Sequence, residues 1–241
     1  MKLTVFNGSP RGEDSNSNRI AQEFMTGAKE AGAEVENVFL AKRNIKHCQG
    51  CFKCWYKTPG KCVIRDDMEG LIQKFVSSDI VVFAMSLYVD NVTGIMKDFM
   101  DRLIPIIDPH FYKDENGECR HEKRYKKYPK LVVISNSGFP ERSHFQVLEL
   151  LFRRVARNLR TKVIAEIYLS PGYAITEAGP QTIANYKDLL RLAGREVVER
   201  SQLTEETVRA LQRPLLPDEE YIRNTNENWD ELLAKLKSSK S

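Results

Sequence analysis

Short apolar runs of strand length alternate with longer amphipathic stretches along most of the chain. Two of these runs, at residues 79–85 and 131–134, are almost entirely apolar, which is typical of strands that are buried on both faces. Such strands occur in parallel sheets that helices cover on both sides. The predicted strands are residues 3–6, 34–40, 79–85, 131–134 and 162–169.

The stretches between these strands carry apolar residues at helical spacing. The predicted helices are residues 17–32, 68–77, 94–107, 143–159 and 181–199. Strands and helices that alternate in this way predict an α/β fold: a doubly wound, five-stranded parallel sheet with helices on both faces. Ligands of such sheets bind outside the carboxyl ends of the strands, so we expect the functional loops there.

Three segments depart from the alternation. Residues 42–66 form an insertion after the second predicted strand. Residues 108–129 are polar and charged, and we expect them to be an excursion over the sheet edge with little strand structure. The core domain is therefore expected to span residues 1–200, followed by a C-terminal extension at residues 201–241. Within that extension, residues 227–237 predict a short amphipathic helix.

The overall charge excludes one class of partner. The net charge is only +4, and the 37 Lys and Arg residues are spread among 33 Asp and Glu residues, so there is no nucleic-acid footprint.

No apolar stretch reaches the ~18 residues that a membrane helix needs, and the chain begins with a strand-like run instead of a signal peptide. We therefore expect a cytoplasmic protein with no nucleic-acid or membrane partner, whose thiols stay reduced.

The loop after the first predicted strand, residues 7–17, is rich in small polar side chains and leads into a helix. A helix N-terminus presents unpaired N–H groups and the positive end of the helix dipole, which favours phosphate. Helix capping alone is the alternative, but a cap needs one such residue. The loop lacks the Walker A and GxGxxG patterns, which disfavours ATP and a dinucleotide bound in the Rossmann manner. The candidate phosphate ligands are Ser9, Arg11, Ser15, Asn16 and Ser17.

Four of the five cysteines fall within fifteen residues, and several chemistries compete for them. Thiolates that converge from a short loop are what a four-iron–four-sulfur cluster requires. Zinc also takes four thiolates, although paired C-x-x-C knuckles are more usual. A redox-active dithiol and a structural role without metal are the remaining alternatives. The candidate metal ligands are Cys48, Cys51, Cys54 and Cys62.

Three segments carry patterns that are known from one protein family. They are Gly-Ser-Pro-Arg at residues 8–11 with Ser-Asn-Ser at residues 15–17, the loop and helix at residues 86–102 with Met-Lys-Asp-Phe-Met-Asp-Arg at its end, and Ser-Asn-Ser-Gly-Phe-Pro-Glu at residues 135–141. These patterns resemble the NAD(P)H-dependent FMN reductases and their relatives, the iron–sulfur flavoproteins. Ser86 stands where that family commonly has proline.

The resemblance implies a flavodoxin-like fold with strand order 2-1-3-4-5, FMN as cofactor and NAD(P)H as a reductant. It places the flavin phosphate on the first loop and the flavin ring at the loops after the third and fourth predicted strands. An isoalloxazine ring needs a flat, partly apolar slot with a few polar groups, and these loops offer both. The iron–sulfur flavoproteins also carry a similar arrangement of four cysteines. The expected flavin contacts, besides those of the first loop, are Ser86, Leu87, Tyr88, Val89, Asn136, Ser137, Gly138 and Phe139.

We therefore predict an FMN-dependent oxidoreductase or electron-transfer flavoprotein that holds a four-iron–four-sulfur cluster. The alternatives are an NAD(P)H-dependent FMN or quinone reductase without a cluster, and a non-catalytic flavin-binding module that senses redox state. No catalytic side chain is predicted, because the flavin itself carries the chemistry.

The expected partners are a small-molecule or protein electron donor and acceptor, and further copies of the chain. The cysteine segment follows the second strand, which lies at the sheet edge in the order 2-1-3-4-5, whereas the flavin lies nearer strands one, three and four. The C-terminal extension adds apolar surface around Trp229. These features predict a homodimer or homotetramer with each cysteine segment near a subunit interface.

Overall fold

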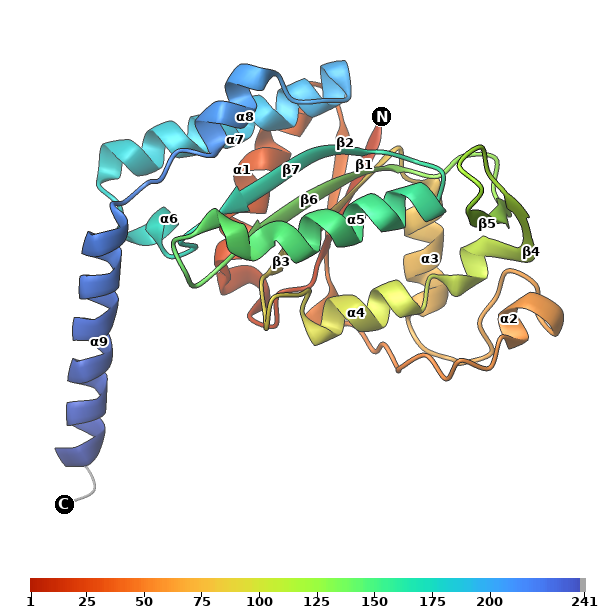
Figure 1. Cartoon of the computed structure of the whole chain (residues 1–241), viewed down its shortest axis with the longest axis horizontal. Coiled ribbons are helices and arrows are strands. Elements are labelled where there is room, and N and C mark those ends of the chain that lie inside the picture. Colours follow the sequence, from red (N-terminus) through yellow and green to blue (C-terminus); the bar gives the residue numbers. More distant parts are fainter. Residues whose placement is uncertain (239–241) are drawn as a thin grey trace.

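The computed structural model describes residues 1–238, and its centre is a five-stranded parallel sheet (Figure 1). The strand order is β2-β1-β3-β6-β7, and each neighbouring pair is parallel. This order confirms the predicted order 2-1-3-4-5, including the edge position of the second strand. The strands are β1 (Lys2–Asn7), β2 (Glu34–Phe39), β3 (Ile80–Ser86), β6 (Lys130–Asn136) and β7 (Val163–Leu169).

Helices cover both faces of the sheet and create two apolar cores (Figure 1). On one face, α1 (Asn16–Glu30) and α7 (Pro180–Arg200) pack side by side. On the other face lie α3 (Met68–Ser77), α4 (Gly94–Asp101) and α5 (Gln146–Asn158). All seven residues of β3 are buried, as expected for a central strand between two helical layers.

The helix predicted at residues 94–107 was too long. It ends at Asp101, and a 3₁₀ turn, η3 (Ile104–Ile106), follows with Pro105 near its start. Proline has no backbone N–H to donate and its ring clashes with the preceding turn, so the α-helix cannot continue through it.

The prediction of little strand structure at residues 108–129 was wrong. An antiparallel hairpin of β4 (Ile107–Lys113) and β5 (Cys119–Lys123) occupies most of this segment. Its charges are paired across elements: Arg157 Nη2 of α5 lies 2.7 Å from Asp114 Oδ2 in the hairpin turn. Charges that are neutralised in this way allow a polar segment to form strands.

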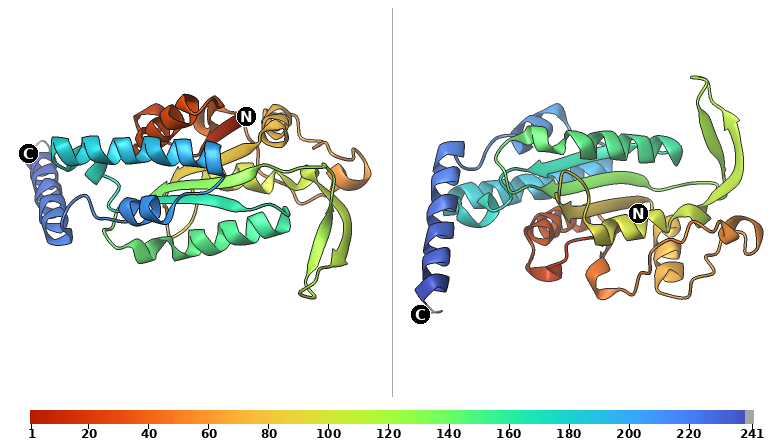
Figure 2. Two further views of the ribbon diagram at one scale, coloured as in Figure 1. Left: turned by 90° about the horizontal axis from the view of Figure 1, so that it is seen from above. Right: turned by 60° about the horizontal axis from the view of Figure 1, so that its bottom comes forward.

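The C-terminal extension contains more helix than predicted. A short helix, α8 (Glu205–Leu211), is followed by α9 (Asp218–Ser238), which begins well before the predicted residues 227–237. Figures 1 and 2 show α9 projecting from one end of the molecule, while the β4–β5 hairpin lies at the opposite end. None of the described helices is both long and apolar enough to cross a bilayer.

Candidate functional site

The loops that follow β1, β3 and β6 meet at the carboxyl edge of the sheet and are joined there by hydrogen bonds. Asn136 Nδ2, at the end of β6, donates to Ser17 Oγ at the start of α1, over 2.8 Å. Ser17 Oγ also lies 3.0 Å from Ser86 Oγ at the end of β3. The backbone N–H of Leu87 donates to the carbonyl of Asn136 over 2.7 Å. The structure therefore brings together the three segments that the sequence selected for flavin binding.

The first loop is held tightly against the start of α4. Thr93 is the N-cap of α4, where its hydroxyl accepts from the N–H of Met96, and the same hydroxyl donates to the carbonyl of Gly8 over 2.6 Å. A Cβ atom on Gly8 would lie only 2.8 Å from Met96 Cβ, so this close approach requires glycine. Sequence analysis did not select Thr93, although a threonine before a helix is a familiar cap signal.

The three serines of the first loop have different partners. Ser15 is the N-cap of α1: its hydroxyl accepts from the N–H of Asn18 over 3.1 Å and donates to the carbonyl of Gly12 over 2.7 Å. Ser17 is engaged with β3 and β6, as described above. The hydroxyl of Ser9 is buried and has no hydrogen-bond partner among the described residues. A buried polar group without a partner is costly, so Ser9 is the serine best suited to an added ligand.

The remaining two candidates of the first loop lie on either side of the helix start. Asn16 is buried in the first turn of α1, where the N–H groups of a helix point out of its end. Arg11 is exposed, and its guanidinium carbon lies 5.9 Å from the centre of the Tyr173 ring, in the loop after β7. Arg11 can therefore reach an anion at the helix start.

The loop after β3 forms a tight turn that projects from the protein. Two backbone hydrogen bonds of 3.0 Å close it, between Tyr88 and Asn91 in both directions. Val89 and Asp90 between them have φ angles of +48° and +56°. A positive φ is unfavourable for a β-branched residue, and the Val89 side chain is 97% exposed. A strained, exposed valine beside a half-exposed Tyr88 is suited to contact a ligand.

The loop after β6 carries a second exposed ring. Ser137 Oγ donates to the carbonyl of Phe139 over 2.8 Å and so shapes the loop. The Phe139 ring stacks on His144 with 4.9 Å between ring centres, and His144 Nδ1 lies 3.6 Å from Asp90 Oδ1 of the β3 turn. His144, which sequence analysis did not select, thus links the two loops expected to hold the flavin ring.

Other elements brace the same loop. The hydroxyl of Tyr221, on α9, donates to the carbonyl of Gly138 over 2.9 Å. Gly172, after β7, donates its N–H to the carbonyl of Ser137 over 2.7 Å, and a Cβ on Gly172 would lie 2.6 Å from Asn136 Oδ1. The loop after β6 is therefore fixed between the sheet and the C-terminal helix.

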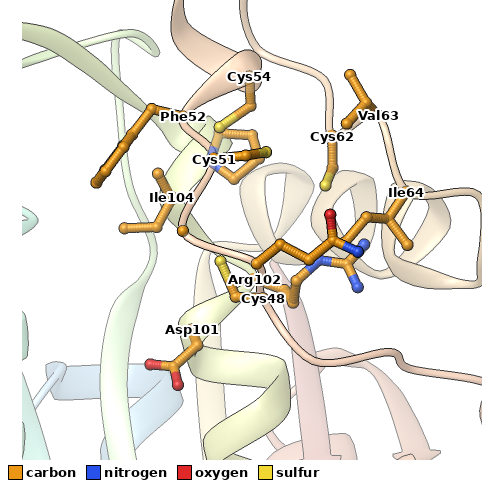
Figure 3. Close-up of a pocket in the computed structure, with 13 residues that line it drawn as sticks. Cys48, Cys51, Phe52, Cys54, Cys62, Val63, Ile64, Asp101, Arg102 and Ile104 are labelled. Atoms are coloured by element: carbon orange, nitrogen blue, oxygen red, sulfur yellow. The ribbon is translucent and has the colours of Figure 1, made fainter.

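The four clustered cysteines surround a cavity at a different place, beside the C-terminal end of α4 (Figure 3). Cys54 lies in a short helix, α2 (Lys53–Tyr56). Burial raises the pKa of the Cys54 thiol, and the charged forms of Cys62, Cys51 and Cys48 raise it further. The sulfurs are therefore close enough to influence one another.

This donor set fits an iron–sulfur cluster. Four cysteines from one short segment face the same cavity, which is the arrangement that the ligands of a cubane require. Among the described residues, no group of three or more His, Cys, Asp or Glu side chains is arranged so that it could hold a metal ion as it stands. Cys48, Cys51, Cys54 and Cys62 are the residues that would hold a cluster.

A buried ion pair lies beside these cysteines. Arg102 and Asp66 have side chains that are 1% and 0% exposed, and Arg102 Nη1 and Nη2 lie 2.7 and 3.0 Å from the two Asp66 oxygens. Burial alone would raise the pKa of Asp66, but hydrogen bonds from Arg102 and from the N–H groups of Lys46 and Met68 hold it below its ordinary value. We call residues 46–66, which this pair closes, the cysteine loop.

The two sites lie at opposite ends of α4. The N-cap Thr93 bonds to Gly8 of the first loop, whereas Arg102 and Ile104, just after the helix, line the cysteine cavity. The helix has 8 residues. At the usual rise per residue its length is about 12 Å. The cysteine cavity is therefore separated from the carboxyl edge of its own sheet by the full length of this helix.

Comparison with known proteins agrees with this architecture. The model of the family described as NADPH-dependent FMN reductase matches residues 1–174. The chain is 38% identical over 105 residues to an iron–sulfur flavoprotein of Archaeoglobus fulgidus, an alignment that covers 44% of this chain and 46% of that protein. It is 33% identical over 106 residues to an iron–sulfur flavoprotein of Methanocaldococcus jannaschii, covering 44% and 53%. The chain thus spans about half the length of these curated relatives.

Solved structures show the same fold. An FMN-dependent NADH-azoreductase from Bacillus anthracis, solved with FMN, superimposes with a TM-score of 0.61 at 18% identity, covering 82% of this chain and 99% of that one. An NAD(P)H:quinone oxidoreductase from Methanothermobacter marburgensis gives a TM-score of 0.60 at 16% identity, covering 82% and 96%.

Proposed function

Because the chain belongs to the NADPH-dependent FMN reductase family, we propose that it binds FMN at the carboxyl edge of the sheet and passes electrons from NAD(P)H to an acceptor. The family membership confirms the resemblance found in the sequence. When bound, FMN supplies the hydride and electron chemistry, and the protein supplies its position and surroundings.

The observation that carries this proposal is the convergence of the first loop with the ends of β3 and β6. Ser17, Ser86 and Asn136 tie these segments together, and the buried hydroxyl of Ser9 is left for a ligand. A phosphate at the N-terminus of α1 would take hydrogen bonds from the helix start and from Ser9, with Arg11 adding charge. Tyr88, Val89 and Phe139 would cover the flat ring and keep water from it.

The identity of the cofactor tests this proposal directly. Heat should release FMN from the purified protein, because the first loop forms a phosphate site and no dinucleotide fingerprint follows it. Chromatography of the released cofactor decides between FMN and FAD, and FAD as the sole product would contradict the proposal. Turnover of NADH or NADPH with a quinone acceptor then separates an enzyme from a flavin-binding sensor, which would bind FMN without turnover.

We propose further that the cysteine cavity holds a four-iron–four-sulfur cluster, supported by four thiols around one cavity and by the similarity of the chain to iron–sulfur flavoproteins. Protein purified without oxygen should contain about four iron and four sulfide per chain. Zinc in place of iron, or no metal after reconstitution with iron and sulfide, would favour a reductase without a cluster.

The arrangement of the two sites supports a homodimer or homotetramer as the working unit. A cluster separated from its own flavin by the length of α4 is better placed to exchange electrons with the flavin of a neighbouring subunit or with a protein partner. The cluster also requires reduced thiols, and thiols stay reduced in the cytoplasm. This supports a cytoplasmic location for the protein.

A further inference from the structure

The buried side chain of Arg102 contacts both ends of the cysteine loop. Its Nη1 donates to the carbonyl of Lys46 over 2.6 Å, two residues before Cys48. Its two terminal nitrogens also bind the carboxylate of Asp66, four residues after Cys62. One side chain from the core of the domain thus joins the first and the last residue of the cysteine loop.

We propose that Arg102 is a positioning residue of the cysteine site, which closes the cysteine loop and stabilises the reduced state of the cluster with its charge and its remaining N–H. The inference rests on the proposed function, in which the four cysteines hold that cluster.

The first part of this role follows from the anchoring geometry. Four ligands from one loop need the ends of that loop at a fixed distance, because a cubane accepts thiolates only in a narrow arrangement. Asp66 receives four hydrogen bonds, from both terminal nitrogens of Arg102 and from the N–H groups of Lys46 and Met68. The planar guanidinium can donate hydrogen bonds from two nitrogens to one carboxylate, whereas lysine has a single nitrogen and cannot.

The second part follows from the atom that Arg102 leaves unused. Its Nε–H is buried and has no hydrogen-bond partner among the described residues. Burial would lower the pKa of Arg102, but the hydrogen bonds and charge of Asp66 and the interaction with the Cys62 side chain raise it. Arg102 and Cys62 line the same cavity, and Arg102 has an N–H still to donate.

The charges around the cavity explain why Arg102 matters for the reduction potential. Among the described residues that line the cavity, the charged side chains are Arg102 and Asp101, and Asp101 is exposed and paired with Lys97 at 2.7 Å. A cluster gains one negative charge when it takes up one electron, and hydrogen bonds to its sulfurs and nearby charge set its potential. A buried cation acts through less water than a surface one, so its effect is larger.

The test compares the protein purified without oxygen with the variant Arg102→Gln. The variant should hold less iron per chain, and its cluster should have a lower midpoint potential in a spectroscopic redox titration. We expect the ratio of reduced to oxidised cluster at a fixed potential to fall about tenfold, which is about 59 mV for a one-electron couple. The matched control is Arg65→Gln, which removes the same charge from an exposed side chain of the same loop and should leave both values unchanged.

Arg102→Lys separates the two parts of the role. It keeps the charge but loses the two-pronged contact, so the potential should stay near that of the wild type while the iron content falls. If Arg102→Gln does not fold, the double variant Arg102→Gln, Asp66→Asn removes both buried charges and leaves none unpaired. Its potential should still be below that of Arg65→Gln, because Arg102 lines the cavity and Asp66 does not.

Two results would overturn the inference and leave the proposed function intact. One is an Arg102→Gln protein whose iron content and potential equal those of Arg65→Gln. The other is a loss of iron with an unchanged potential in the remaining clusters, since Arg102 would then be only a structural clamp. A wild-type protein that takes up no iron after reconstitution would instead end the proposed cluster, and this inference with it.

Discussion

At the scale of single residues, variants of two serines in the first loop should separate FMN binding from the stability of the protein. Among the described residues the buried hydroxyl of Ser9 has no hydrogen-bond partner, so Ser9→Ala should not lower the free energy of unfolding and should raise it slightly, because an unsatisfied polar group is removed. In the loaded protein the same change should weaken FMN binding by about 1.5–3 kcal/mol, the usual value of a hydrogen bond to a charged group. Isothermal titration with FMN and urea unfolding of the apoprotein measure the two quantities.

Ser15→Ala is the matched control, because Ser15 lies in the same loop but caps α1. Its loss should lower the free energy of unfolding by about 1 kcal/mol. A Ser9 variant that is destabilised as much as the Ser15 variant, or that binds FMN with unchanged affinity, would show that the phosphate lies elsewhere.

At the scale of elements, the turn after β3 holds Val89 in a conformation that its own side chain opposes. Asparagine tolerates a positive φ much better than valine and is favoured in tight turns of this kind. Val89→Asn should therefore raise the free energy of unfolding of the apoprotein by about 1 kcal/mol, and weaken FMN binding if the apolar side chain covers the flavin ring. Val147→Asn, at a half-exposed valine on α5, is the control and should show neither effect. An apoprotein that is no more stable as Val89→Asn would mean that the turn carries no strain.

The ion pair that closes the cysteine loop predicts a dependence of stability on pH. The folded-state pKa of Asp66 is lowered, so its contribution to stability is present above the ordinary carboxyl pKa, about 3.9, and is lost as the pH falls through the lower folded value. Asp66→Asn should lose about 3–5 kcal/mol at pH 7, because the buried charge of Arg102 is left unpaired. Its stability should then fall less than that of the wild type as the pH is lowered from about 5 toward 2.

Urea unfolding of the cluster-free protein across this pH range measures both effects. Asp67→Asn, at the neighbouring carboxylate that bonds to the N–H of Asn44, should keep the wild-type profile. Equal acid slopes for the wild type and Asp66→Asn would contradict the argument.

Sequence patterns predicted the elements whose burial is regular, and missed those that depend on distant partners. The apolar runs of β3 and β6 lie between two helical layers, so nearly every residue in them is apolar and the pattern is plain. The β4–β5 hairpin has half-exposed, charged strands that are stabilised by contacts such as Arg157 with Asp114, and no local pattern shows such a contact.

The same limit applies to the site. The sequence selected the three loops that meet at the carboxyl edge and the four cysteines that share a cavity. It gave no role at a site to Thr93, whose hydroxyl bonds to Gly8 across 85 residues, or to Arg102, which bonds to Asp66 across 36. It also did not select His144, whose link to Asp90 exists only in the folded chain.

At the scale of the whole molecule, α9 and the separation of the two sites together argue for more than one subunit. The helix projects from the domain, with Tyr221 of its first turns bonded to the loop after β6 (Figure 1). Farther along, Trp229, Leu232 and Leu233 are each about half-exposed on a helix that a monomer leaves largely uncovered. Acidic residues dominate the start of α9 and lysines its end, so two copies packed antiparallel would place opposite charges side by side.

We therefore predict a homodimer or homotetramer in solution, and light scattering at micromolar concentration should give at least twice the mass of the chain. The variant Trp229→Glu, Leu232→Glu should shift the protein toward the monomer, because each carboxylate would have to be desolvated in the interface. Val147→Glu, a half-exposed valine on another helix, should leave the mass unchanged. A wild-type monomer would contradict this prediction at once.

The monomeric variant also tests how the two sites work together. Its flavin should still be reduced by NAD(P)H, because the loops at the carboxyl edge come from one chain. Reduction of the cluster by that flavin should be much slower than in the wild type, because the length of α4 lies between the two sites of one subunit. Stopped-flow spectroscopy follows flavin and cluster separately after mixing with NADPH. A monomer that reduces its cluster at the wild-type rate would mean that electrons pass between the two sites of one chain. Electron transfer to the cluster would then not require the oligomer.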